Sequence, residues 1–393
     1  MDNQIVLNLE QVPKELSLIL ELIKDQQDES HQIYHELFKD INWELFIDLS
    51  LHHRLYPILY KKAKQCNDVI PVNVTKTLYQ YYQRNTFQML HLTREMETVS
   101  QLLDENQIRV LFLKGPHLAY ELYGDLSLRT SSDLDFLIPI EALETVGNLL
   151  SELGYAKDDY IQTVLNDWRW RHHHVTYIHP EKGLKLEVHW RLHPGPGIEP
   201  SFNDLWDRKS ITSITSSPVY YLGKEDLFVF LVSHGSRHGW SRLRWLVDIN
   251  QLLKLDVNWE IVCKLFKKGK SLSVGGQSIV LATYLINSHI HETLNPLLKG
   301  KQPMRLAQDA VFYLENMVNL HTTPVPEKTA RYHSRHLFSL MSLSQKLLFI
   351  LSFLYPYPED AKTLPLPKKL HFLYFPLRPF LWGWRKTRKH AIS

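Results

Sequence analysis

The chain has 393 residues, 44% of them hydrophobic and 22% charged, which is an ordinary composition for a globular protein of two or three domains. Its 45 Lys and Arg residues nearly balance its 42 Asp and Glu residues, so it lacks the broad basic excess expected of a nucleic-acid enzyme. It has no run of about 20 apolar residues, and residues 1–4 do not begin a signal peptide. Cys66 and Cys263 lie far apart without metal-type spacing, which favours reduced thiols and a cytoplasmic location.

Apolar residues recur at helical spacing in the first quarter of the chain. Leu16, Ile19 and Ile23 are one example, and residues 43–51 contain another. Such stripes are usually core faces, so we assign them no chemistry. They predict an N-terminal helical lobe over residues 1–104.

A compact apolar run at residues 109–113 is typical of a buried strand, and Lys114 and Gly115 follow it as a tight turn. Residues 116–123 are then predicted to form a short helix, because Pro116 occupies the favoured first position. The N-terminus of such a helix presents free N–H groups to an anion. Gly115 would let a phosphate approach these groups closely.

The next segment alternates polar and apolar residues in the way a strand requires. Asp133 and Asp135 fall on one face, and Leu134, Phe136 and Ile138 fall on the other. Two carboxylates one pleat apart repel each other, so the pair needs a cation, and Mg²⁺ suits oxygen ligands at this spacing. A solvated strand end or turn is the plain alternative for an isolated Asp-x-Asp motif.

Two further strands, at residues 175–179 and 184–190, flank a Pro-Glu-Lys-Gly turn and predict a hairpin. Glu187 lies on the second strand and shares a face with Lys185 and His189. Glu187 is thus a third carboxylate on an otherwise well-packed strand. The predicted order is strand, glycine turn, helix, Asp-x-Asp strand, helix and hairpin.

Residues 168–174 form the densest cluster of aromatic, basic and histidine side chains in the chain. A zinc site is poorly supported here, because adjacent strand residues point apart and no Cys or carboxylate partner lies at ligand spacing. Two interpretations stay open. The segment lines the mouth of a site, where His174 and Arg169 or Arg171 meet substrate or phosphate, or it is purely structural.

With these motifs, the chain resembles the bacterial uncharacterised nucleotidyltransferases of the DNA polymerase beta-like superfamily. The matching segments are residues 112–115, 128–138 and 186–192, with a further match at residues 233–234 and 240–248. The resemblance implies an α+β fold. In it, a polymerase-beta-like core, made of a small mixed sheet with helices, is flanked by N-terminal and C-terminal helical regions.

The resemblance also implies a site. Asp133, Asp135 and Glu187 would hold two Mg²⁺ ions, and Glu187 would also help to deprotonate the acceptor. The usual Gly-Ser pair of the superfamily is Gly115-Pro116 here, so one phosphate-binding hydroxyl is missing. The residues expected to hold the phosphates of a nucleoside triphosphate are Lys114, Gly115, Arg129, Ser131 and Ser132.

The predicted function is Mg²⁺-dependent transfer of a nucleoside monophosphate from a nucleoside triphosphate to a hydroxyl or similar acceptor, with release of pyrophosphate. The acceptor is expected on a small molecule or a peptide, and a nucleic-acid partner is not expected. The alternative is a non-catalytic nucleotide-binding scaffold or sensor with the same fold, which the missing serine supports. Substrate contacts are assigned to His174, His189, His234 and Asp248, although Arg244, one turn earlier, would explain Asp248 as an intrahelical ion pair.

The remaining boundaries follow from composition. The nucleotidyltransferase core is assigned to residues 105–222, a C-terminal helical domain to residues 223–355 and a tail to residues 356–393. Residues 194–217 are rich in Pro, Gly and Ser and predict a loop. The tail has six prolines, which exclude one regular helix, and eight basic but no acidic residues after residue 360. It suits an extended arm wrapping its own protein, a membrane or partner surface, or a nucleic-acid strand.

Overall fold

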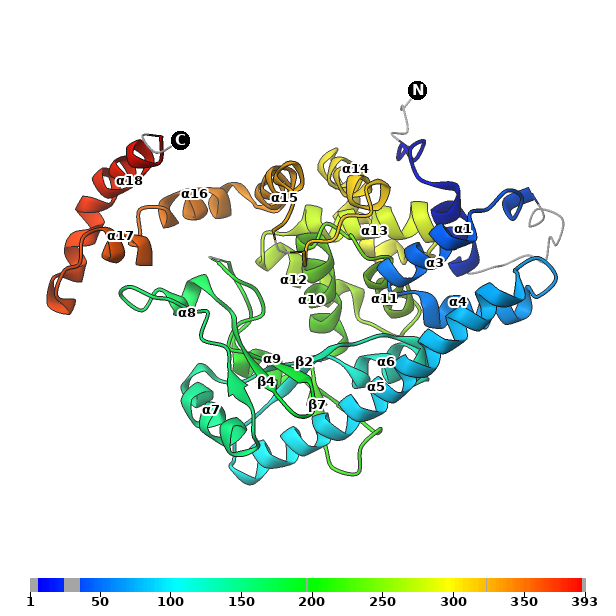
Figure 1. The fold of residues 1–393 in the computed structure, drawn as a ribbon, viewed down its shortest axis with the longest axis horizontal. Coiled ribbons are helices and arrows are strands. Elements are labelled where there is room, and N and C mark those ends of the chain that lie inside the picture. Colours follow the sequence, from blue (N-terminus) through cyan, green and yellow to red (C-terminus); the bar gives the residue numbers. More distant parts are fainter. Residues whose placement is uncertain (1–5, 25–35, 196, 323, 391–393) are drawn as a thin grey trace.

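A computed structural model of the chain describes residues 6–24, 36–195, 197–322 and 324–390. The described chain is a mixed α+β structure, in which helices surround a seven-stranded sheet, so the predicted fold class is confirmed (Figure 1). The strands are β1 (Leu111–Lys114), β2 (Asp133–Leu137), β3 (Ala156–Lys157), β4 (His174–His179), β5 (Leu184–His189), β6 (Ser210–Thr212) and β7 (Val219–Tyr221). The α-helices are α1 (Lys14–Ile23), α3 (Trp43–His52), α4 (Tyr56–Gln65), α5 (Val72–Glu105), α6 (Pro116–Tyr123), α7 (Leu143–Glu152), α8 (Trp168–Arg171), α9 (Phe202–Asp207), α10 (Lys224–Arg237), α11 (Leu243–Leu253), α12 (Trp259–Lys268), α13 (Leu272–Ile286), α14 (Gln302–Glu315), α15 (Glu327–Leu340), α16 (Leu343–Ser352), α17 (Pro358–Thr363) and α18 (Tyr374–His390). Short 3-10 helices are η1 (Leu126–Leu128), η2 (Ile140–Ala142), η3 (Glu292–Leu298) and η4 (Lys368–Leu373).

The sheet has the strand order β3-β4-β5-β2-β1-β7-β6. β2 runs antiparallel to β1 and parallel to β5, so it lies between the glycine turn and the hairpin. The register pairs Asp133 with Lys185 and Asp135 with Glu187, and an irregularity in β1 places Lys114 opposite Asp135. Because directly paired residues on neighbouring strands are close, this register brings the predicted carboxylates together.

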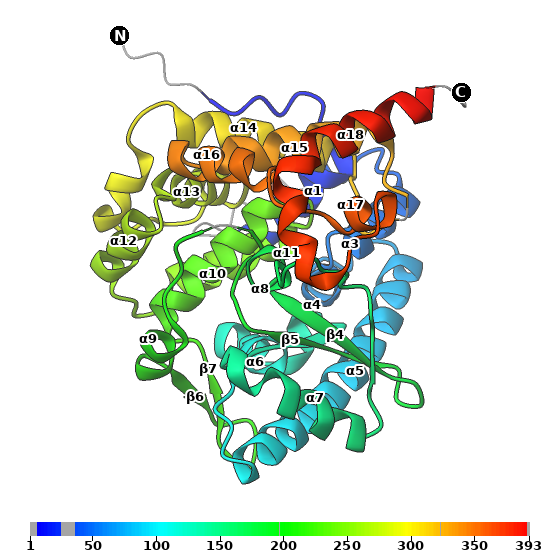
Figure 2. The same cartoon turned by 90° about the vertical axis from the view of Figure 1, so that its left-hand side faces the viewer.

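The opposite face of β2 is apolar and closes a hydrophobic core. Leu134, Phe136 and Ile138 are buried in one cluster with Val146 and Leu150 of α7. The C-terminal half of α5 supplies further buried side chains to this cluster, and Figure 2 shows α5 and α7 on the same side of the molecule. The predicted division of the strand into a polar and an apolar face is therefore confirmed, and the carboxylates stand on a packed support.

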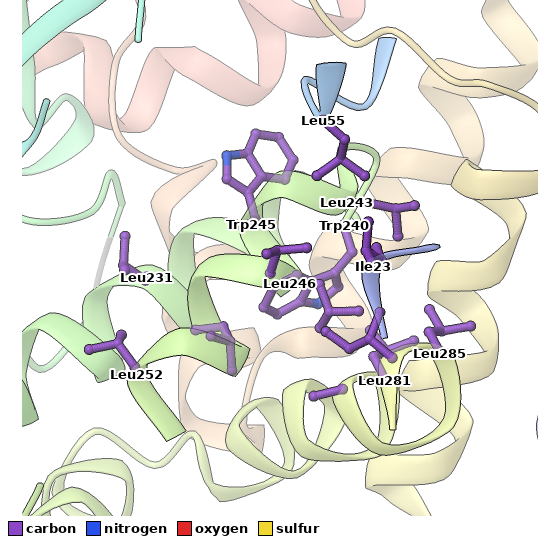
Figure 3. Packing of buried hydrophobic residues seen from close by; sticks show 14 of the residues in the cluster. Ile23, Leu55, Leu231, Trp240, Leu243, Trp245, Leu246, Leu252, Leu281 and Leu285 are labelled. Atoms are coloured by element: carbon purple, nitrogen blue, oxygen red, sulfur yellow. The ribbon is translucent and has the colours of Figure 1, made fainter. Parts of the chain in front are cut away.

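The helices outside the sheet form a second, larger core. Helices α1, α3 and α4 from the N-terminal part pack with α10, α11, α13 and α14 in one cluster of buried side chains. Figure 3 shows Ile23 and Leu55 from the N-terminal part near Trp240, Leu246 and Leu281 from the C-terminal part. Helix α5 contributes to both cores, since its first half joins this cluster and its second half joins the cluster under the sheet. The predicted domain boundaries remain predictions.

The predicted loop at residues 194–217 contains two regular elements, α9 and β6, so the prediction of a plain loop is wrong there. Helix α9 begins with a capping box, in which Ser201 and Asp204 each accept a hydrogen bond from the other's backbone N–H. β6 extends the sheet because it pairs with β7. A capping box depends on only two residues, so the Pro, Gly and Ser content of the whole segment does not indicate it.

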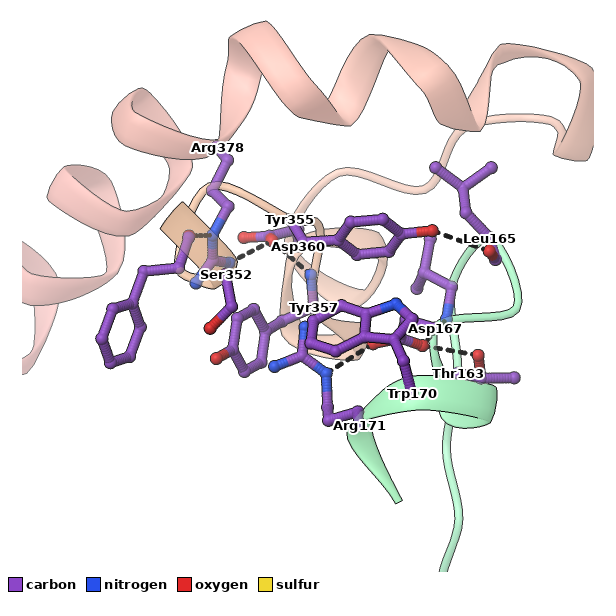
Figure 4. A network of polar contacts seen from close by, with 12 residues as sticks. Thr163, Leu165, Asp167, Trp170, Arg171, Ser352, Tyr355, Tyr357, Asp360 and Arg378 are labelled. Atoms are coloured by element: carbon purple, nitrogen blue, oxygen red, sulfur yellow. Dashed lines mark hydrogen bonds and ion pairs between the residues drawn. The ribbon is translucent and has the colours of Figure 1, made fainter. Parts of the chain in front are cut away.

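The tail is folded, and the predicted extended arm is wrong. Its prolines prevent one regular helix, and the tail forms α17, η4 and α18 one after another. Asp360 is fully buried and pairs with Arg378 at 2.5 Å and with Arg385 at 2.7 Å. The Tyr355 hydroxyl donates a hydrogen bond to the carbonyl of Leu165, which ties the start of the tail to the segment before α8 (Figure 4). Among the helices of the described residues, none is both long and apolar enough to cross a membrane.

Candidate active site

Three carboxylates share one face of the sheet near its centre. Asp133 and Asp135 come from β2, and Glu187 comes from the neighbouring parallel strand β5. The side chains of Asp133, Asp135 and Glu187 are 26%, 1% and 15% exposed. The structure thus brings the three predicted metal ligands onto one face, with Asp135 at its deepest point.

Two lysines oppose the charge of these carboxylates. Lys114 Nζ lies 3.2 Å from Asp135 Oδ1. Lys185 Nζ lies 2.5 Å from Glu187 Oε1 and 3.7 Å from Asp133 Oδ2. Both cations reduce the mutual repulsion of the carboxylates. Lys114 was predicted as a site residue, whereas Lys185 was not, although its position two residues before Glu187 was the signal.

His189 lies beside two of the carboxylates. Its Nε2 atom is 3.4 Å from Asp135 Oδ1 and 3.7 Å from Glu187 Oε2, and its side chain is 4% exposed. His174 pairs with His189 across the hairpin, and its Nε2 atom is 3.9 Å from Glu187 Oε2. The structure therefore places these two predicted substrate contacts at the edge of the carboxylate face.

The donor set fits a divalent cation. Ligand atoms of Asp135, Glu187 and His189 all lie within 4.8 Å of one another, and Asp133 shares their strand face. Both carboxylate oxygens of Asp135 are buried, and neither accepts a hydrogen bond. A buried carboxylate without hydrogen bonds is costly unless cations neutralise it. The carboxylate oxygens are ligands that Mg²⁺ prefers. Because the site also includes an imidazole, it suits transition metals as well.

The pKa values of these groups reflect their shared burial. Burial and the charge of Asp135 raise the pKa of Asp133. Burial alone would raise the pKa of Glu187, but the nearby His189 and His174 outweigh burial and lower that pKa strongly. Burial alone would lower the pKa of His189, but the neighbouring carboxylates of Asp135 and Glu187 raise it. Burial and the charge of His189 lower the pKa of His174 to about 4, so His174 is neutral at pH 7.

The predicted phosphate site lies at the turn between β1 and α6. Gly115 has a φ of 132°, and a Cβ atom there would lie 3.1 Å from the side chain of Leu134, so any other residue would be strained. Helix α6 begins at Pro116, and its first turn carries the free N–H groups of a helix start. Ser131 Oγ donates to the backbone carbonyl two residues later, and Ser132 is exposed.

Arg129 and Asp248 form a buried ion pair that the sequence did not reveal. Arg129 Nε lies 3.0 and 3.1 Å from the two carboxylate oxygens of Asp248, and the Tyr123 hydroxyl donates to the same carboxylate at 2.8 Å. Both charged side chains are at most 1% exposed, so neither is open to a phosphate or a substrate. Arg244, the expected partner of Asp248, instead donates to the carbonyl of Thr130. We therefore assign Arg129 and Asp248 to holding the segment before β2.

His234 on α10 belongs to an aromatic cluster at the border of the helical core. Its ring centroid lies 4.6 Å from that of His238 and 5.3 Å from that of Trp245. Burial and the charge of Lys114 lower the pKa of His234 well below its usual value, so its ring is neutral at pH 7. The structure does not bring His234 into the group of ligand atoms around Asp135.

A cavity of about 460 Å³ lies beside the segment that follows β5. It is lined by the segment after β5 and by helices α10, α15 and α16, including His193, Glu199, Arg237 and Phe349. None of the three carboxylates lines it, but His193 on its wall interacts electrostatically with His189. Sequence reasoning missed this cavity because its walls are far apart in the chain, and no local pattern marks them.

Fold and site together define a class, the α+β proteins that carry carboxylates on neighbouring strands beside a glycine turn. Residues 39–287 match the family described as uncharacterised nucleotidyltransferase. The match covers more than half of the chain, and the chain belongs to this family. It includes every predicted site residue, whereas α14 to α18 lie beyond it.

One solved structure offers a weaker likeness. It is an antigenic nucleotidyltransferase-like protein from Paracoccidioides brasiliensis, with 16% sequence identity and a TM-score of 0.31. The comparison covers 52% of this chain and 95% of that chain. No curated protein matches the chain.

Proposed function

We propose that this protein is a metal-dependent nucleotidyltransferase, which transfers a nucleoside monophosphate from a nucleoside triphosphate to a hydroxyl or similar acceptor. The observation that carries the proposal is the environment of Asp135. Its buried carboxylate accepts no hydrogen bond, and two further carboxylates share its face of the sheet. Membership of the nucleotidyltransferase family supports the class of reaction.

In this proposal Asp133, Asp135 and Glu187 hold two Mg²⁺ ions, which supply the positive charge that polarises the phosphate and activates the acceptor oxygen. A bond forms between that oxygen and the α-phosphorus, and the bond from the α-phosphorus to the bridging oxygen of pyrophosphate breaks. Glu187 helps to take the acceptor proton. His189 keeps the carboxylates oriented, because its Nε2 atom lies beside Asp135 and Glu187.

The phosphates are held on the side of the glycine turn. Lys114 is within reach of this region because it ends β1, and the N-terminus of α6 favours an anion. Gly115 leaves room for close approach, while Ser131 and Ser132 replace the hydroxyl that Pro116 lacks. Arg129 does not bind phosphate in this proposal, because it already pairs with Asp248.

In this proposal the acceptor occupies the cavity, whose wall includes His193, four residues after His189. The cavity walls are largely apolar, and Arg237 and Glu199 supply charged groups among them. Such a mixture suits a small organic molecule or a peptide segment better than a nucleic-acid backbone. Burial lowers the pKa of Arg237, although Glu199 opposes this shift, so an anionic acceptor group would be a favourable partner for the guanidinium.

The test is a calorimetric titration with each nucleoside triphosphate, with and without Mg²⁺, combined with an assay for pyrophosphate release. Wild type should bind one triphosphate in a Mg²⁺-dependent way, and Asp133→Asn/Asp135→Asn should lose this binding. Asp159→Asn is the matched control, because that side chain follows the edge strand β3 and is 85% exposed. Binding that is equal in the double variant, or independent of Mg²⁺, would contradict the proposal.

A non-catalytic nucleotide-binding scaffold or sensor is the second candidate. The observation in its favour is Pro116, which offers no hydroxyl or N–H group at the start of α6. A scaffold would bind the triphosphate and release no pyrophosphate with any acceptor. The same titration therefore separates the two functions.

A further inference from the structure

The last helices of the chain expose an unusual amount of apolar surface. We call residues 343–390, from α16 to α18, the C-terminal arm. Of the 26 exposed large hydrophobic side chains in the described part of the chain, 14 lie between residues 343 and 384. Leu343 is 86% exposed, Leu347 59%, Phe380 76% and Trp382 55%. A concentration of exposed apolar side chains in one segment of the chain marks an interaction surface.

Helix α16 shows the pattern most clearly, because one side of it lines the cavity and another side exposes leucines. Gln345, Phe349 and Ser352 line the cavity. Leu343 and Leu347, at the spacing of one helical turn, are exposed to solvent. The outer face therefore does not serve the packing of its own protein.

The arm is held in place although this surface is uncovered. The guanidinium of Arg171 lies 4.1 Å from the ring centroid of Tyr357, and the Tyr355 hydroxyl bonds to the carbonyl of Leu165 (Figure 4). Asp360 joins α17 to α18 through Arg378. In Figures 1 and 2, α16 and α18 lie on the side of the molecule away from α7. The apolar residues thus project from an ordered support.

The charge of this region is strongly one-sided. The arm, residues 343–390, contains nine Lys or Arg residues and two acidic residues, for a net charge of +7, while the rest of the chain has a net charge of −4. Of the two acidic residues, Asp360 is fully buried against arginines, so only Glu359 is exposed. Lys362, Lys368 and Lys369 are exposed among the apolar side chains.

We infer that the C-terminal arm docks the protein on the surface of an anionic lipid membrane. Apolar and aromatic side chains among lysines are the composition of a helix that lies in the interface of such a membrane, where the lysines meet lipid phosphates. A second copy of the chain is a poor occupant, since two arms of the same positive charge would repel each other. A nucleic acid would engage the lysines but leave Leu343 and Leu347 in water.

The inference is independent of the proposed transfer reaction and rests on the arm alone. Its test is a flotation assay of the full chain with two kinds of vesicle, phosphatidylcholine alone and phosphatidylcholine mixed with phosphatidylserine. The chain should float with the anionic vesicles and stay unbound with the neutral ones, and raised salt should weaken the binding. Equal binding to both vesicles, or binding to neither, would overturn the inference.

Two variants separate the apolar and the charged contributions. Phe380→Ala/Trp382→Ala should lower the partition onto anionic vesicles by about tenfold or more, because the aromatic side chains no longer enter the interface. Lys368→Glu/Lys369→Glu should lower it by at least about fivefold per lysine. Both pairs are exposed, so the fold should be unchanged by circular dichroism.

Matched controls lie on other surfaces. Phe87→Ala replaces a phenylalanine that is 72% exposed on α5, and Lys264→Glu replaces a lysine that is 76% exposed on α12. Neither should change vesicle binding by more than about twofold. If the controls reduce binding as much as the arm variants, the association is non-specific and the inference fails. If the arm variants abolish self-association or nucleic-acid binding and leave vesicle binding intact, a different occupant covers the arm.

Discussion

The carboxylate face and the C-terminal arm both carry groups that are costly in water or in a protein interior, but they differ in what compensates for them. On the carboxylate face, Lys114, Lys185 and His189 surround the acidic groups, and the buried carboxylate of Asp135 lacks hydrogen bonds. On the arm, whole side chains such as Leu343 are uncovered. The first site lacks only what a small ion and a phosphate chain would supply, whereas the second needs a large surface.

The largest expected effect concerns the carboxylate face. Asp135→Ala should reduce pyrophosphate release by about a thousandfold or more, because the metal contributes several kcal/mol to stabilising the transferred phosphate. The fold should be retained, and the thermal unfolding midpoint should be unchanged or higher, since the repulsion between Asp135 and the carboxylates of Asp133 and Glu187 is removed. Asp159→Ala is the exposed control. If Asp135→Ala retains activity, the carboxylate face does not hold the metal ions of the reaction, and the comparison fails.

The second effect tests whether Arg129 and Asp248 are structural. Arg129→Ala should lower the free energy of unfolding by about 3–5 kcal/mol in denaturant titrations, because it leaves a buried carboxylate unpaired. Arg129→Met/Asp248→Leu should recover most of the loss. Arg331→Ala, which breaks an exposed pair with Glu327, should change stability by less than about 0.5 kcal/mol. If Arg129→Ala is as stable as wild type but binds nucleotide more weakly, Arg129 belongs to the phosphate site.

The part of the fold that the sequence predicted correctly is the part set by local patterns. The helix expected at residues 116–123 has those bounds, and the expected strand at residues 133–138 and hairpin at residues 175–190 are present. Alternation alone was enough to separate Asp135 from the apolar face of β2. These features depend on neighbours in the chain, so they are visible without a structure.

The part that could not be predicted depends on register and on distant partners. The face that Lys185 and His189 share with Glu187 was visible in the sequence, but their contacts with Asp133 and Asp135 depend on the register in which β5 pairs with β2. Arg129 meets Asp248 across 119 residues, whereas the sequence suggested the i,i+4 pair with Arg244. An ion pair between distant segments has no local signature, so the nearest candidate was an incorrect choice.

A third prediction sharpens the role of the compensating lysines. Lys185→Met should raise the affinity for Mg²⁺ without nucleotide by roughly tenfold, because Lys185 and the cation compete for Glu187 and Asp133. Isothermal titration calorimetry measures this directly. Lys157→Met is the control, since its partner Asp159 is exposed. A weaker affinity in Lys185→Met would show that the lysine does not compete with the cation.

The smallest expected effect lies on the arm. Phe380→Ala/Trp382→Ala should change the free energy of unfolding by less than about 0.5 kcal/mol in the absence of vesicles, because both side chains are already exposed. Chemical denaturation followed by circular dichroism measures it. A loss of several kcal/mol would mean that the protein itself covers these side chains in solution, and the contrast with the carboxylate face would disappear.

The most direct test of the account is a count of bound Mn²⁺, as a spectroscopic substitute for Mg²⁺, by electron paramagnetic resonance. Free and bound Mn²⁺ are compared for wild type, Asp135→Asn and Asp159→Asn, each with and without the nucleoside triphosphate that binds. The account predicts that wild type and Asp159→Asn bind Mn²⁺ more tightly with the nucleotide, and that Asp135→Asn loses this binding. Equal Mn²⁺ binding by all three proteins would contradict it.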